Sequence, residues 1–207
     1  MKEFSVPMAI TDFIPVTLFF AAALRIFFDL KGKMTTLSGL LYLAGSLMVS
    51  ATAMGKALYK LIYAVSAGAA DITWLDDQFF IGESIGFLLA GTGLLLTIRE
   101  EKKGTLTRAI APVGLCVGLI ILGETAMYGV LCQYASKMRK RAAIVLFLVS
   151  YVFSLIMGYL SSKDMSSAAL NWTAQAINTA GQLALLLGAM ILHNSGLGRE
   201  KKYLEDR

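Results

Sequence analysis

The chain has 207 residues, of which 57% are hydrophobic and 16% are charged, and its mean hydropathy is +0.66. Soluble globular chains carry about 25% charged residues, whereas the charges here stand in short runs between long apolar stretches, so we exclude a soluble domain and predict an all-α integral membrane protein. The net charge of +5 fits basic residues that flank membrane spans and contact the lipid bilayer, and we expect no nucleic-acid partner.

Six segments are long enough to cross an apolar bilayer core of about 30 Å, which requires about 20 residues. Polar runs separate these segments, which are 8–29, 35–64, 79–98, 109–134, 142–161 and 169–193. We therefore predict a polytopic bundle of six transmembrane helices that forms a single domain over residues 1–198. Residues 199–207 are predicted to form a charged, solvent-exposed tail. The expected location is a bacterial cytoplasmic membrane.

The orientation of this bundle is not decided by its basic residues. Six spans place both termini on one side, and lysines and arginines then divide almost equally between the two sides. The alternative is seven spans, with an extra short span at 56–73 after a tight turn at Gly55. That alternative groups Lys31 and Lys33 with residues 137–141 on the cytoplasmic side and leaves the N-terminus outside.

Three spans followed by three indicate a tandem repeat, and an odd number of spans in each half would make it an inverted repeat. The third span has glycines at 86, 91 and 93, and the sixth has glycines at 181 and 188. Apolar helices also resemble one another by composition alone, so the 3+3 inverted repeat is one of two interpretations.

Ionisable side chains inside the spans are the main candidates for function, because they are costly in lipid unless they face a partner or a cavity. Lys56 and Lys60 are four residues apart and project from one helix face. In the six-span arrangement Asp12, Glu83 and Glu124 lie in the same half of the membrane as these lysines.

Two interpretations of this charge cluster remain open. In the first, Lys56 contacts a substrate, and Glu83 or Glu124 serves as its partner or as a proton carrier. In the second, the charges form structural ion pairs near the interface. We favour the structural interpretation for Asp12 and Lys60 and the functional one for the other three.

Carboxamides form a second polar feature in the sixth span. Asn171, Gln175, Asn178 and Gln182 follow a 4-3-4 spacing and share one helix face, which His193 extends. Gln175, Asn178 and Gln182 are candidate substrate-binding residues for a neutral polar group. Equally, the stripe could hold helices together by hydrogen bonds.

Glycine pairs four residues apart predict close helix packing within the bundle, which we favour over the alternative of a dimer interface. One pair is Gly114 and Gly118, and the other is Gly82 and Gly86 around Glu83.

We predict no metal site and no cofactor, because the chain has one histidine and no phosphate-binding glycine loop. The leading functional hypothesis is a permease or channel-like protein for a small polar solute, anionic or zwitterionic. The alternatives are a non-catalytic membrane subunit or sensor, and a membrane-embedded enzyme acting on a lipid or isoprenoid head group. A homo-oligomer or a partner membrane subunit is left open.

Overall fold

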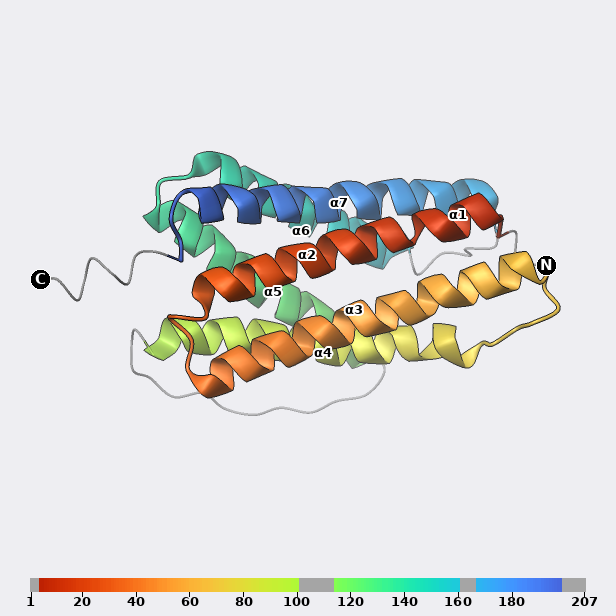
Figure 1. Ribbon diagram of the computed structural model, residues 1–207, viewed down its shortest axis with the longest axis horizontal. Helices are drawn as coiled ribbons and strands as arrows, with labels where there is room; N and C mark the ends of the chain where they lie inside the picture. The colour runs from red at the N-terminus through yellow and green to blue at the C-terminus, as the bar shows by residue number, and fades with distance from the viewer. Residues whose placement is uncertain (1–3, 101–113, 161–166, 199–207) are drawn as a thin grey trace, which may run out of the picture.

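The computed structural model describes residues 4–100, 114–160 and 167–198, and these residues fold into helices and turns without any strand. Side chains are described in these ranges except at 99–100 and 114–117. The helices are α1 Val6–Thr11, α2 Phe13–Leu30, α3 Thr36–Val65, α4 Trp74–Glu100, α5 Gly114–Lys137, α6 Arg141–Leu160 and α7 Ala168–Asn194 (Figure 1).

Five of the described helical stretches are long and apolar enough to cross a membrane, which indicates an integral membrane protein. They are Val6–Leu30 (α1 and α2 together), Thr36–Val65, Trp74–Ile98, Arg141–Leu160 and Ala168–Asn194. The all-helical, membrane-spanning fold class is therefore confirmed. The number of spans stays a prediction, because α5 is not among these five.

Local chemistry explains where several helices begin and end. Ser5 and Thr35 cap α1 and α3 with their side-chain oxygens. The break at Asp12 between α1 and α2 precedes Pro15, which has no backbone N–H to donate to the preceding turn. Asp76 and Asp77 lie in the first turn of α4, where negative charge stabilises a helix, so this helix begins at Trp74 and not at 79 as predicted.

Neighbours in sequence are neighbours in space, and α7 packs against α2, so the helices form a closed ring. The contact between α3 and α4 is the most extensive. Glycines permit it, because a side-chain carbon at Gly86 would lie 2.9 Å from the Gly45 carbonyl oxygen.

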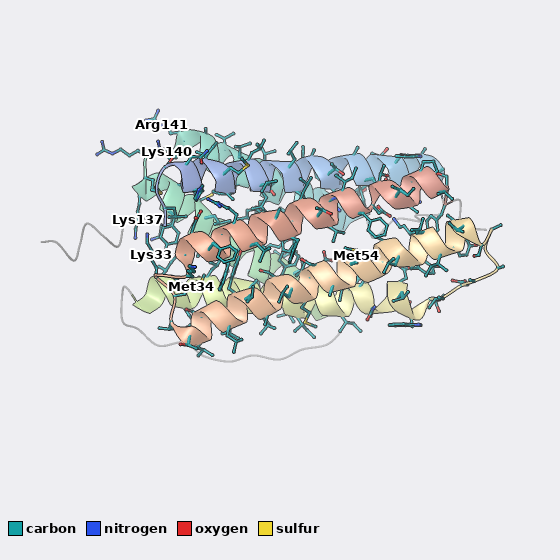
Figure 2. All side chains as sticks on the ribbon, viewed as in Figure 1. Lys33, Met34, Met54, Lys137, Lys140 and Arg141 are labelled. Carbon is teal, nitrogen blue, oxygen red and sulfur yellow. The ribbon has the colours of Figure 1, made fainter. Side chains whose placement is uncertain are left out.

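Helices α2, α4, α5 and α7 run in one direction, and α3 and α6 return (Figure 1). We call the end at which α1 begins the N-terminal end. The opposite end, at Lys33, Lys137, Lys140 and Arg141, is called the basic end (Figure 2). Consequently α4 and α5 are parallel, which side-chain contacts corroborate: Gly93 of α4 lies beside Tyr42 near the start of α3, and the ring centre of Tyr134 in α5 lies 5.1 Å from the Lys33 ammonium.

This direction of α5 corrects two predictions. The start of α1 and the end of α7 lie at opposite ends of the bundle, so the expectation of both termini on one side is wrong. Both halves, α1–α4 and α5–α7, run in the same sense, so a 3+3 inverted repeat is wrong. Residues 109–113 of the predicted fourth span lie outside the described residues.

The seven-span alternative is wrong about its extra span, because α3 continues through Gly55 to Val65 and residues 66–73 contain no helix. The seven-span alternative is nevertheless right to group Lys33 with residues 137–141. Lys33 lies at the same end as Lys137 and Arg141 (Figure 2).

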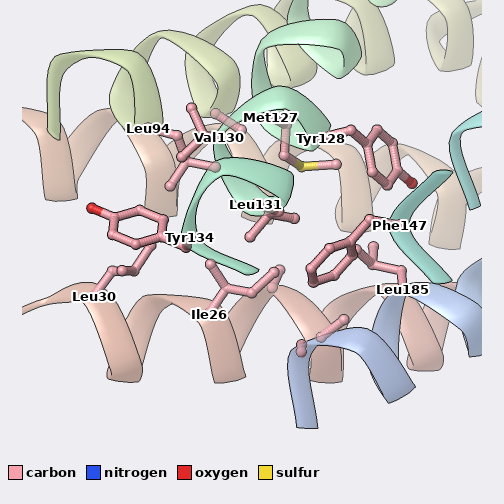
Figure 3. Close-up of a cluster of buried hydrophobic side chains, with 14 of the residues drawn as sticks. Ile26, Leu30, Leu94, Met127, Tyr128, Val130, Leu131, Tyr134, Phe147 and Leu185 are labelled. Carbon is pink, nitrogen blue, oxygen red and sulfur yellow. The ribbon is translucent and has the colours of Figure 1, made fainter. Parts of the chain in front are cut away.

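The largest cluster of buried hydrophobic side chains, called the hydrophobic core below, lies mainly in the half of the bundle nearer the basic end. It includes Ile26, Leu94, Leu131, Phe147 and Leu185, which are all at most 2% exposed (Figure 3). Within the described residues, the ionisable groups singled out from the sequence lie outside this core, toward the N-terminal end.

Candidate functional site

Asp12 and Lys60 form an ion pair between the α1–α2 junction and the last turns of α3. The Lys60 Nζ lies 2.8 Å from an Asp12 carboxylate oxygen, and the two side chains are 12% and 14% exposed. The ammonium also lies 5.6 Å from the centre of the Phe4 ring. This geometry supports the structural interpretation, because each charge already has an opposite charge in direct contact.

Lys56 lies one turn earlier on α3 and faces α4 instead. Its Nζ is 3.9 Å from the centre of the Phe79 ring and 5.1 Å from that of Phe80. The carboxylates of Asp76 and Glu83 are close enough to interact with it electrostatically. Lys56 therefore packs against aromatic faces and has carboxylates and the Lys60 ammonium in its electrostatic surroundings, without a direct ion pair among the described contacts.

The α4 partners of Lys56 were partly missed by sequence reasoning, which selected Glu83 alone. Asp76, Phe79 or Phe80, and Glu83 follow one another at three- or four-residue intervals, so they form one stripe of α4. That spacing was a usable signal. What it could not reveal is that this stripe faces Lys56.

Glu124 is buried in α5, with 4% of its surface exposed. Its carboxylate accepts a hydrogen bond of 2.5 Å from the Ser154 hydroxyl of α6 and interacts electrostatically with Glu83. One turn further along α5, the hydroxyls of Tyr128 and Ser150 are 2.7 Å apart. Sequence reasoning did not include Ser150 and Ser154, although their four-residue spacing in an otherwise apolar helix marks one polar face.

The carboxamide stripe of α7 divides into two parts. Gln175 accepts a hydrogen bond of 2.5 Å from the Thr11 hydroxyl and donates one of 2.8 Å to the Met8 carbonyl, which fastens α7 to α1. Asn171 donates to the Ser167 carbonyl at 3.1 Å. These contacts favour the structural interpretation for this end of the stripe.

The other part of the stripe lies further along α7, nearer the middle of its length. Asn178 is half-buried, and the buried carbonyl oxygen of Gln182 has no hydrogen-bond partner among the residues that the structure describes. A buried acceptor without a donor is costly. Gln182 is thus the member of the stripe best suited to receive a hydrogen bond from a ligand or from water.

The arrangement as a whole is a string of polar groups that leads inward from the N-terminal end. It passes from Asp76 to Lys56, then to Glu83, and ends at Glu124 with Ser154. Because the hydrophobic core begins beyond Glu124, the string reaches the middle of the bundle but does not cross it.

No protein-family model, no curated protein and no solved structure is significantly similar to this chain. Conclusions about its function therefore rest on geometry. The described residues contain no group of three or more His, Cys, Asp or Glu side chains that could hold a metal ion. His193, at the basic end, is instead 2.8 Å from Asp29.

Proposed function

We propose that this chain is a permease for a small polar solute that is anionic or zwitterionic, acting in a bacterial cytoplasmic membrane. Lys56, Glu83 and Glu124 would contact the solute, with Gln182 and Asn178 as neutral hydrogen-bonding groups. The observation that carries the proposal is the incomplete pairing of Lys56. Its ammonium rests on aromatic rings near two carboxylates, so a solute carboxylate or phosphate could still approach it.

Placing these charges in a membrane is energetically costly. A lysine or acid near the bilayer centre costs about 2.5–3.5 kcal/mol on insertion scales. For Asp12 and Lys60, their direct ion pair offsets part of this cost. For Lys56, Glu83 and Glu124 the pairing is looser, which is typical of sites that exchange partners during function.

We infer further that α5 is a sixth membrane-crossing helix. Its 24 residues give a length of about 36 Å, enough to cross the apolar core of a bilayer. It also carries Glu124 between α4 and α6, so the proposed site needs it within the membrane.

The basic end is inferred to be cytoplasmic. Outside the helices, the described residues at this end include Lys31, Lys33, Arg139 and Lys140, whereas the loop 66–73 at the N-terminal end has no lysine or arginine. By the positive-inside tendency, the N-terminal end is then outside. The solute would enter from that side, and the hydrophobic core would separate it from the cytoplasm.

A reconstituted uptake assay tests this proposal. In liposomes, Lys56→Met and Glu83→Gln should each abolish uptake of the transported anion or zwitterion, whereas the matched double variant Asp12→Asn/Lys60→Met should retain it. Candidate solutes would be presented as a labelled set of small carboxylates, phosphates and amino acids. Unchanged uptake in both Lys56→Met and Glu83→Gln would remove these residues from the mechanism.

A second candidate function is a non-catalytic membrane subunit or sensor. The Asp12–Lys60 ion pair and the hydrogen bonds of Gln175 favour it, since both join helices and leave little capacity for a ligand. In that case Lys56→Met would change the thermal stability of the protein, and none of the labelled solutes would enter the liposomes.

A further inference from the structure

An open surface cavity of about 440 Å³ lies at the turn between α5 and α6, far from the charge cluster. Ser136, Arg139, Arg141 and Ile144 line it, and the first three are exposed while Ile144 is half-buried. Two of these side chains are guanidinium groups and one is a hydroxyl, so three of the four can donate hydrogen bonds.

The surroundings of this cavity are strongly positive. Lys137 and Lys140 belong to the same turn, and Lys33 reaches the same end of the bundle from the α2–α3 connection (Figure 2). Residues 136–144 include no acid that could neutralise the two arginines. The ammonium groups of Lys33 and Lys137 lie 5.1 and 5.7 Å from the centre of the Tyr134 ring, which brings both lysines to one side chain next to the cavity.

We propose that this cavity binds a phosphate group, and that the phosphate belongs to the headgroup of an anionic phospholipid. Guanidinium groups match phosphate oxygens with paired N–H donors. Basic pockets at the ends of membrane helices are suited to such headgroups. Ile144 gives the cavity one apolar wall, which fits a ligand that continues into hydrocarbon.

The competing explanation for lipid binding at the basic end is general attraction by the basic residues that flank membrane spans. Under that explanation every lysine or arginine at the basic end attracts anionic lipid equally, by charge alone. A specific lipid site predicts a different result, because only the residues that line the cavity should then hold the lipid.

The backbone at Arg139 permits a clean substitution. Its φ of +55° lies in the left-handed region, which glycine adopts without strain. The turn is closed by backbone hydrogen bonds from Lys140 to Ala135 and from Arg139 to Ser136, at 2.8 and 2.9 Å. Arg139→Gly therefore removes the guanidinium without disturbing the turn.

The test measures lipid retention by the purified full-length chain. Phosphatidylglycerol binding is compared with phosphatidylcholine binding by native mass spectrometry for the wild type, for Arg139→Gly/Arg141→Gln, and for the control Lys31→Gln/Lys140→Gln. Both double variants lose two positive charges at the same end. We expect the cavity variant to lose phosphatidylglycerol affinity by about tenfold or more, and the control by much less.

Equal losses in the two double variants would overturn the proposal, because they would show attraction by charge alone. Added inorganic phosphate distinguishes the source of the phosphate group. If inorganic phosphate binds in an Arg139-dependent manner and phosphatidylglycerol does not, the lipid assignment is overturned in favour of a soluble anion. A melting temperature at or above that of the wild type for Arg139→Gly alone verifies that the fold is kept.

Discussion

Two lysines one turn apart on α3 have different surroundings. Lys60 is in direct contact with Asp12, whereas Lys56 lies over the rings of Phe79 and Phe80. They have the same residue type and share a helix face, but their partners come from different helices. At the scale of single residues, the partner decides whether a buried charge is structural or available.

Asp12→Asn should destabilise the protein by about 3 kcal/mol, because it leaves the Lys60 ammonium without its carboxylate in a mostly buried position. The double variant Asp12→Asn/Lys60→Met should recover much of that loss, since neither charge remains. Unfolding in detergent micelles followed by circular dichroism measures both values. If the loss of stability in the double variant equals the sum of the losses in Asp12→Asn and Lys60→Met alone, the two residues do not interact.

Sequence reasoning identified most charged members of the cluster but few of their contacts. Asp12, Lys56, Lys60, Glu83 and Glu124 stand out because any ionisable group in an apolar span is unusual. Ser154 and Phe79 do not stand out as single residues, and only their spacing from polar residues on the same helix marks them. Their importance comes from facing Glu124 and Lys56, which depends on helix rotation and packing.

At the scale of helices, the contact between α4 and α5 depends on two glycines. A side-chain carbon at Gly91 would lie 2.5 Å from the Gly123 carbonyl oxygen and 3.0 Å from the Gly123 Cα. The predicted packing role is confirmed for Gly82 and Gly86, which meet α3 closely. It is wrong for Gly118, because a side-chain carbon at that position would have no neighbouring atom within 4 Å among the described residues.

Gly91→Val should separate α4 from α5 and destabilise the protein by about 1–3 kcal/mol or more, since backbone atoms cannot move aside as a flexible side chain can. Gly129→Val is the matched control on α5, because a side-chain carbon at Gly129 would meet no described atom within 4 Å. Melting temperatures in micelles compare the two. Similar losses would show that helix propensity, and not the α4–α5 contact, sets the cost.

The direction of α5 could not be predicted from its sequence. The hydropathy of an apolar segment is the same whichever direction the helix takes across the membrane. The prediction assumed that every span reverses the one before it. Glu124 nonetheless lies near Glu83 as expected, because it is close to the middle of α5 and a reversal of the helix moves it little.

At the scale of the whole molecule, the direction of α5 determines at which end of the bundle the basic α5–α6 turn lies. The even division of lysines and arginines between the two sides followed from the assumption that each span reverses the one before it. With α4 and α5 parallel, the turns at 31–35 and 138–140 lie at one end and the loop 66–73 at the other. Among the described turns and loops, lysine and arginine therefore gather at the basic end.

Cysteine labelling in intact cells tests this arrangement. In a background with Cys116 and Cys132 replaced by serine, Ala69→Cys should react with a membrane-impermeant maleimide added outside. Gly32→Cys and Met138→Cys should react only after the cells are permeabilised, because both turns belong to the basic end. Opposite accessibility of positions 32 and 138 would contradict the parallel α4 and α5.

The uneven distribution of apolar packing has a mechanical consequence. The largest apolar cluster joins the helices nearer the basic end, whereas the N-terminal end combines buried apolar residues such as Met8 and Tyr59 with the Asp12–Lys60 ion pair. We therefore expect the N-terminal end to open at a lower free energy than the rest of the bundle. Small rotations about the apolar cluster would then widen the space around Lys56 most, because displacement grows with distance from the pivot.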